Sequence, residues 1–129
     1  MVFEGSHGSG KTTQAHLLIG FNSLYSKEPF LDDLKPIIEK YSRIQNNISA
    51  YLLLYLHTAD RYVHINFIKE KSKNGTVIIS DRYFFSSLVY QRIQGIPIPL
   101  IKQLNHFCII PQITFIFNLP LIERKKKIR

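Results

Sequence analysis

The sequence is poor in cysteine and in long apolar runs, and each shortage excludes a class of protein. Its 129 residues include one cysteine, Cys108, which excludes an internal disulfide and a zinc site built on cysteines and favours a reducing cytoplasm. No apolar run approaches the roughly 20 residues that a membrane span needs. The start, Met1–Gly5, has neither the basic nor the apolar segment of a secretory signal. We therefore expect a cytoplasmic protein without a membrane segment.

Acidic residues are also scarce, with 9 Asp and Glu against 17 Lys and Arg, so that the formal net charge is +8. Such a balance suits polyanionic partners, which include nucleic acid, an acidic membrane surface and phosphorylated small molecules. The content of 45% hydrophobic and 20% charged residues is that of a globular protein and excludes wholesale disorder. The length predicts a single domain.

Short apolar stretches rich in β-branched and aromatic residues predict buried parallel strands. The predicted strands are 1–4, 76–80, 113–118 and, more weakly, 22–26. Because these stretches are apolar throughout, without alternation, they are typical of a sheet covered on both faces.

Helical patterns lie between the predicted strands. The longest has apolar residues three or four apart, which we expect to face the core: Ile44, Ile48, Leu52, Tyr55, Leu56, Ala59, Val63 and Phe67. It should end near Asn74-Gly75, a C-cap signal, and shorter helices are predicted over 11–19 and 99–108. Alternating strands and helices predict a three-layer α/β/α domain with a parallel sheet.

The strongest motif is Gly-Ser-His-Gly-Ser-Gly-Lys-Thr at 5–12, which matches G-x-x-x-x-G-K-[ST] between a predicted strand and a predicted helix. Glycines let consecutive N–H groups surround a phosphate at a helix N-terminus. Lys11 adds charge toward the β- and γ-phosphates, and the Thr12 hydroxyl suits Mg²⁺. The motif predicts ATP or GTP binding on a P-loop NTPase fold. The predicted ATP-binding residues are Gly5, Ser6, His7, Gly8, Ser9, Gly10, Lys11, Thr12 and Thr13.

Two Asp-Arg pairs are further candidates. Asp81-Arg82 directly follows a predicted strand, at the edge of the sheet where ligands bind, so Asp81 can hold magnesium and Arg82 a phosphate. Asp60-Arg61 lies inside the long helix, with His57 one turn before Arg61 and His64 three residues after it. On residue types alone, this second group favours a solvated polar stripe.

Together these motifs resemble the thymidylate kinase family, P-loop nucleoside monophosphate kinases, over nearly the whole chain. The block Asp-Arg-Tyr…Ser-Ser-x-x-Tyr-Gln is the most specific part of the resemblance. The segments that carry it are Val2–Gln14, Lys27–Pro29, Ala59–His64, Asp81–Gln91 and Pro111–Pro120.

The resemblance implies transfer of the γ-phosphoryl group of Mg·ATP to dTMP by a homodimer that binds neither nucleic acid nor membrane. It implies Lys11, Arg82 and Asp81 as catalytic residues, with Thr12 and Asp81 near the metal. It places Arg61 at the thymine edge and Tyr90 under the sugar. The implied dTMP-binding residues are Lys27, Glu28, His57, Arg61, Arg82, Ser87, Tyr90 and Gln91.

Several positions depart from the family pattern. His7 stands where the family usually has an acidic residue near the sugar 3′-hydroxyl, and His57 stands where an aromatic ring, usually Phe, stacks on thymine. Phe30 replaces the first glycine of a pair, and Asn118 replaces an Asp after the last predicted strand. Because His7 and His57 alter the acceptor side, a related kinase with another acceptor stays open. A nucleotide-binding protein without catalysis is a further alternative.

The chain ends at Arg129, where the family has a mobile basic lid and then a last strand and helix. We expect 1–129 to be one kinase domain that lacks most of this part, with Arg124 or Arg129 as the lid arginine. A solvated basic tail is the alternative for 124–129. Two explanations stay open, a truncated protein or a sequence with residues left out, and the short stretch between Gln14 and Lys27 favours the second.

Overall fold

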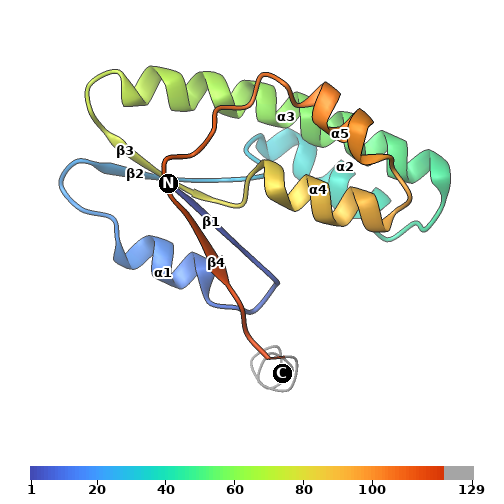
Figure 1. The fold of residues 1–129 in the computed structure, drawn as a ribbon, viewed down its shortest axis with the longest axis horizontal. Coiled ribbons are helices and arrows are strands. Elements are labelled where there is room, and N and C mark those ends of the chain that lie inside the picture. The colour runs from blue at the N-terminus through green and yellow to red at the C-terminus, as the bar shows by residue number, and fades with distance from the viewer. Residues whose placement is uncertain (121–129) are drawn as a thin grey trace.

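The computed structural model describes residues 1–120, which form a four-stranded parallel sheet with helices on both faces (Figure 1). The strands are β1 (Val2–Gly5), β2 (Ser23–Lys27), β3 (Val77–Asp81) and β4 (Thr114–Phe117). The helices are α1 (Lys11–Leu17), a 3₁₀ turn (Asp32–Leu34), α2 (Lys35–Ser42), α3 (Asn47–Ser72), α4 (Phe84–Ile93) and α5 (Ile98–Leu104). All four predicted strands are confirmed.

The strand order is β2-β3-β1-β4, so β1 lies between β3 and β4. Val2 pairs with Ser80 on one side and with Thr114 on the other. All pairs are parallel, so the strands end at one edge of the sheet. The loops that follow β1, β2 and β3 therefore meet there, which is where a ligand binds in such sheets.

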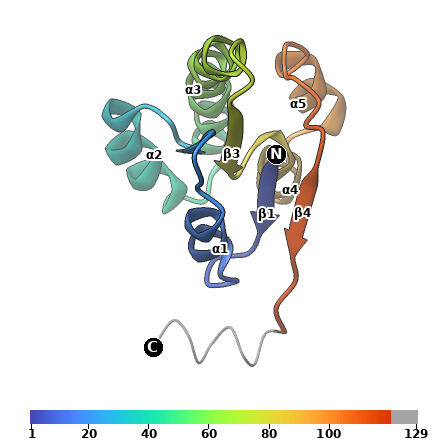
Figure 2. The same ribbon diagram turned by 90° about the vertical axis from the view of Figure 1, so that its left-hand side faces the viewer.

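The sheet is the middle of three layers, as predicted (Figures 1 and 2). On one face, Ala15 of α1 packs with Phe3 and Ile79 in a buried cluster. On the other face, Val2 packs with Ile65 of α3. Val2 and Phe3 thus pack into separate cores on the two faces of the sheet, because successive side chains of a strand point to opposite faces.

The predicted inner face of the long helix is wrong. Ile48 is 80% exposed and Tyr55 is 54% exposed. The buried side chains of α3 are instead Ser49, Ala50, Leu53, Leu54, Asp60, Arg61, His64 and Ile65. The helix carries apolar residues on more than one side, so spacing alone does not select the face that packs.

Some other boundaries differ from expectation. β4 is not covered on both faces, since Ile116 is 78% exposed, and within residues 1–120 this strand pairs on one side alone. α5 ends at Leu104, four residues before the predicted end at 108. The helix α2 was not predicted. No helix within residues 1–120 has the length and apolar character to cross a membrane.

Candidate active site

The loop between β1 and α1 needs glycine at two positions. Gly5 has φ +148°, and a Cβ there would lie 2.6 Å from the carbonyl oxygen of Phe117 on β4. Gly10 precedes α1 with φ +90°, in the left-handed region that other residues avoid. These glycines let the chain turn tightly from the strand into the helix.

Lys11 is the first residue of α1 and is buried, with 6% of its surface exposed. Its Nζ donates a hydrogen bond to the carbonyl oxygen of Ser6, 3.2 Å away, so the side chain folds across its own loop. Burial, followed by the charge of Arg82, lowers the pKa of Lys11. An anion bound in the loop would favour the charged form of Lys11 and so act against both effects.

Asp81 ends β3 beside the loop and is 1% exposed. Its Oδ2 accepts hydrogen bonds from the Thr12 hydroxyl and from the Tyr25 hydroxyl, the latter at 3.2 Å. Its Oδ1 is buried and has no partner within residues 1–120. A hydroxyl and a carboxylate are hard oxygen ligands of the kind that Mg²⁺ prefers. Thr12 and Asp81 therefore fit a magnesium ion.

Tyr25 was not among the predicted site residues. It lies on β2, and its ring stacks on His16 of α1 with the centroids 4.2 Å apart. Burial, followed by the charge of Asp81, raises the pKa of Tyr25 to about 12. The hydroxyl is therefore a hydrogen-bond donor at neutral pH.

Arg82 has φ +72°, which is uncommon outside glycine. Its N–H donates to the carbonyl oxygen of Phe3 at 2.9 Å, and its carbonyl oxygen accepts from the Ser80 hydroxyl at 2.8 Å. The guanidinium carbon lies 5.5 Å from the centre of the Tyr90 ring, within cation–π range. Such backbone strain is typical of functional positions, where surrounding contacts hold it.

Glu4 fastens the segment after Arg82 to β1. Its carboxylate accepts hydrogen bonds from the N–H of Tyr83 at 2.9 Å, and from the N–H and hydroxyl of Ser86 at 3.2 and 2.7 Å. It therefore satisfies backbone donors in the first turn of α4, as an N-cap would. Burial raises the pKa of Glu4 in spite of these hydrogen bonds.

The polar residues of α3 form a buried network with the loop after β2. Arg61 is 1% exposed, and its Nη2 lies 2.6 Å from Glu28 Oε2. His64 joins Glu28 to Ser26, with Nδ1 3.1 Å from Glu28 Oε1 and Nε2 2.8 Å from Ser26 Oγ. The expected solvated stripe is therefore wrong, because the Glu28 carboxylate of the loop and the Ser26 hydroxyl of β2 satisfy these groups inside the core.

Arg61 also reaches α4 and α5. Its Nη2 donates to Ser87 Oγ at 2.9 Å, and its Nη1 donates to Asn105 Oδ1 at 2.7 Å. Together with the bonds to Glu28, four of its five N–H groups are engaged. One Nη1 hydrogen has no partner within residues 1–120, and Arg61 lines a cavity.

This cavity, of about 470 Å³, contains all eight residues implied for the acceptor. They are Lys27, Glu28, His57, Arg61, Arg82, Ser87, Tyr90 and Gln91. Gln91 is buried, and its Oε1 has no partner within the described part of the chain. Burial, followed by the charge of Arg61, lowers the pKa of His57. The cavity therefore holds a neutral imidazole beside a cationic guanidinium.

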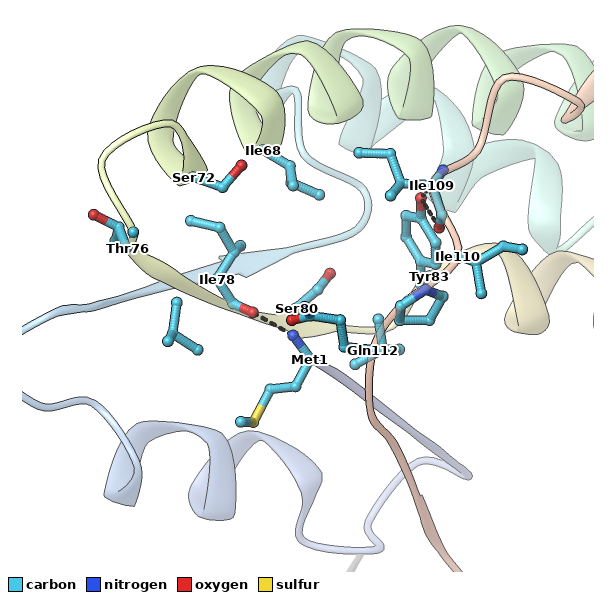
Figure 3. A pocket seen from close by; sticks show the side chains of 14 residues that line it. Met1, Ile68, Ser72, Thr76, Ile78, Ser80, Tyr83, Ile109, Ile110 and Gln112 are labelled. Atoms are coloured by element: carbon cyan, nitrogen blue, oxygen red, sulfur yellow. Dashed lines mark hydrogen bonds between the residues drawn. The ribbon is translucent and has the colours of Figure 1, made fainter.

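A second cavity, of about 510 Å³, lies at the opposite edge of the sheet (Figure 3). It is lined by Met1 and Val2 at the amino end of β1, by residues of β3 such as Ile78, by the end of α3, by Tyr83 and by residues 109–112. None of the predicted site residues lines it.

Comparison with known proteins addresses the identity of this fold. The family model described as "Thymidylate kinase" matches residues 3–129. The chain belongs to the thymidylate kinase family. It is 40% identical over 128 residues to a "Probable thymidylate kinase" of Methanococcus aeolicus, covering 98% of this chain and 64% of that protein. It is 36% identical to one of Metallosphaera sedula, covering 100% of this chain and 65% of that protein.

A crystal structure of thymidylate kinase from Ehrlichia chaffeensis is similar throughout, with a TM-score of 0.78 and 32% identity over 99% of this chain and 80% of the other. The three-layer P-loop fold is thereby confirmed. The chain spans 64–65% of the length of the two curated relatives described above.

Within this thymidylate kinase fold, the structure brings most predicted residues to one edge of the sheet. The residues of 5–13 lie in the phosphate loop or start α1, and His7 and Thr13 are exposed there. Asn118 follows β4 and is exposed. The candidate lid residues Arg124 and Arg129 lie outside the described residues.

Four residues with organising contacts were not predicted as site residues: Glu4, Tyr25, His64 and Asn105. Glu4 lies in a predicted strand, and Tyr25 lies in the most weakly predicted one. Both were therefore interpreted as parts of strands and not as site residues. The sequence shows His64 three residues after Arg61 on one helix, but residue types alone placed it on a solvated stripe and not in a site. Nothing in the sequence connects Asn105 with Arg61.

Proposed function

We propose that this protein transfers the γ-phosphoryl group of Mg·ATP to dTMP, giving dTDP and ADP. One observation carries the proposal: three buried side-chain atoms within residues 1–120 have no hydrogen-bond partner, Ser9 Oγ, Asp81 Oδ1 and Gln91 Oε1. They lie in the phosphate loop, beside Thr12 and in the acceptor cavity, respectively. Buried polar atoms without partners call for an explanation. A nucleotide, its cation and a base would supply one.

At the phosphate end, Lys11 and the loop amides bind the ATP phosphates, and Thr12 and Asp81 would hold Mg²⁺, which would offset the charge of the phosphates. A bond forms between an oxygen of the dTMP phosphate and the γ-phosphorus, and the bond from that phosphorus to the β-phosphate oxygen breaks. Because the attacking oxygen is already ionised, no strong general base is required. Lys11 and Arg82 position the groups and offset their charge.

At the acceptor end, the Arg61 N–H that has no partner within residues 1–120 supports binding of a carbonyl oxygen on the thymine edge. Gln91 and Ser87 offer further base contacts, and His57 would lie on the base. Lys27 and Arg82 line the same cavity and carry the positive charge that a monophosphate requires. The Tyr90 ring would crowd a ribose 2′-hydroxyl and so favour deoxynucleotides.

A coupled assay of ADP release against dTMP, dUMP, dCMP, dGMP and AMP tests the proposal. We expect turnover that depends on Mg²⁺ and is fastest with dTMP. Faster turnover with another monophosphate would identify a related kinase with a different acceptor. Binding of ATP with no turnover of any acceptor would identify a nucleotide-binding protein without catalysis.

We infer also that the protein is a single kinase domain over 1–129 and a homodimer of the cytoplasm, with no nucleic-acid or membrane partner. The support for dimerisation is the exposed apolar face of α3, which includes Ile48, Tyr55 and Tyr62. Contiguous exposed apolar side chains are typical of protein interfaces. Sedimentation should show a dimer for the wild type and a monomer for Tyr55→Glu.

A further inference from the structure

The carboxylate of Asp81 accepts hydrogen bonds from two hydroxyl groups, which belong to two different elements of the fold. Thr12 comes from α1, and Tyr25 comes from β2, the strand next to β3. Both donate to Oδ2, so Oδ1 is the oxygen without a partner within residues 1–120. The two donors therefore determine which oxygen stays available.

The position of Tyr25 is itself held from two sides. Tyr25 pairs with Ile79 across β2 and β3, two residues before Asp81. On α1, the His16 ring stacks on the phenol ring at 4.2 Å with the planes 29° apart. The ring thus spans from α1 to the end of β3. A change to phenylalanine would keep the ring and its stacking and remove the hydroxyl alone.

We propose that Tyr25 is a positioning residue for the magnesium site, and that its hydroxyl orients Asp81 so that Oδ1 faces the cation or its water. The inference rests on the proposed function, because it takes Thr12 and Asp81 as the residues near the cation of Mg·ATP. Groups that hydrogen-bond to metal-binding side chains hold them in place, and their loss typically costs about 10- to 100-fold in metal affinity.

The alternative is that Tyr25 has only a structural role, in which it packs against the buried cluster of Phe3, Ala15 and Ile79. Its hydroxyl would then have no effect on metal affinity. A fold defect would weaken nucleotide binding with or without metal. If Tyr25 positions Asp81, loss of its hydroxyl weakens metal binding and leaves nucleotide binding without metal unchanged. The two roles can therefore be distinguished by measurement.

The test is binding of Mn²⁺ to the full chain with ADP, followed by electron paramagnetic resonance. Mn²⁺ accepts the same oxygen ligands as Mg²⁺. We expect Tyr25→Phe to weaken Mn²⁺ binding to the ADP complex by about tenfold, and to leave the affinity for ADP in EDTA within twofold of the wild type. The matched control is Tyr41→Phe, a tyrosine of α2 that does not line the acceptor cavity, which should behave as the wild type.

The outcomes separate this inference from the proposed function. Equal Mn²⁺ affinity in Tyr25→Phe and wild type would overturn the role of Tyr25 and leave the kinase proposal standing. Equal weakening of ADP binding with and without metal would also overturn it, in favour of a structural role. A wild-type chain that binds no Mn²⁺ with ADP would overturn both.

Discussion

Three residues at the ligand edge of the sheet each carry a distinct part of the proposed chemistry. Lys11 is a buried cation in the phosphate loop, His57 lies in the acceptor cavity, and His7 is exposed on the loop. Each role can be tested by one substitution, because none of these side chains donates to more than one protein group in the described structure.

Lys11→Ala should lower kcat by about 10³-fold or more, the scale of a single cation at a transferring phosphoryl group. The coupled ADP assay measures it at saturating dTMP. Lys69→Ala removes an exposed cation near the end of α3 and should leave kcat unchanged. Retention of more than about a tenth of the activity would contradict the role of Lys11, because the loss would then be under about 1.4 kcal/mol.

His57→Phe should tighten dTMP binding, because stacking of a base on an aromatic ring is typically worth about 1–3 kcal/mol and a phenyl ring supplies more of it than imidazole. Since burial lowers the pKa of His57, the imidazole is neutral at pH 7 and at pH 8. Titration calorimetry should therefore show the same gain at both. His106→Phe on the surface is the control. Unchanged or weaker binding would mean that His57 does not lie on the base.

His7→Asp should increase the preference for dTMP over its 3′-deoxy analogue at least several-fold in kcat/KM. A carboxylate accepts a hydrogen bond from the 3′-hydroxyl worth about 1.5–3 kcal/mol, and neutral imidazole accepts it more weakly. His7→Asn adds an uncharged acceptor of similar size and should give a smaller gain. An identical ratio in all three proteins would place His7 away from the sugar.

At the scale of elements, α3 and the loop after β2 together form one part of the wall of the acceptor cavity. Asp60 on α3 accepts hydrogen bonds from the N–H of Phe30 at 2.8 Å and from the N–H of Leu31 at 2.7 Å. Phe30 in turn stacks on His64, with the centroids 4.9 Å apart. The helix thus holds, through backbone N–H groups, the loop that begins at Glu28 directly after Lys27.

Asp60→Asn should destabilise the fold by about 1–3 kcal/mol, because one carboxylate oxygen is replaced by a donor that faces backbone N–H groups. Urea unfolding measures the change, and KM for dTMP should rise as the loop loosens. Asp33→Asn, an exposed residue of the 3₁₀ turn, should change stability by less than about 0.5 kcal/mol. Equal stability of Asp60→Asn and wild type would show that the loop is held by other contacts.

The strands β1, β3 and β4 could be predicted from the sequence because each is a short run rich in β-branched or aromatic residues, and β2 carries a weaker form of the same pattern. The face of α3 that is buried in the protein could not be predicted in this way. Its polar residues become favourable inside the protein through Glu28 and through the N–H groups of Phe30 and Leu31, which are distant in the sequence. Helical period reports where apolar residues lie on one element, not which partner another element supplies.

At the scale of the whole molecule, two buried carboxylates respond to pH with opposite sign. Burial raises the pKa of Glu4, so its contribution to stability is full below its ordinary value of 4.5 and is lost as the pH rises through the raised value. Burial also acts to raise the pKa of Glu28, but the hydrogen bond from His64 and the charge of Arg61 outweigh it, and the net shift is downward. The contribution of Glu28 is therefore present above 4.5 and lost on acidification.

Glu28→Gln should therefore reduce stability at pH 7 by about 3 kcal/mol or more, because it leaves the buried guanidinium of Arg61 without its counter-charge. The difference from wild type should shrink as the pH falls below 4.5, where the wild-type carboxylate becomes protonated. Urea unfolding at a series of pH values measures both chains. A stability difference independent of pH between 3 and 7 would contradict this assignment.

The phosphate loop, the four strands and the family follow from the amino-acid sequence alone. The loop depends on local backbone freedom at Gly5 and Gly10, and the strands depend on composition over a few residues. The family motifs are likewise contiguous stretches of chain. Each of these features is encoded by neighbours in the sequence.

The packing of the elements in three dimensions establishes which polar side chains meet. It joins Arg61 to Asn105, 44 positions later, and Tyr25 to Asp81, 56 positions later. These pairs form because strand order and helix packing bring distant elements together, and because buried polar groups must find partners wherever the fold supplies them. The orientation of Asp81 and of Arg61 is therefore a property of the assembled sheet and helices.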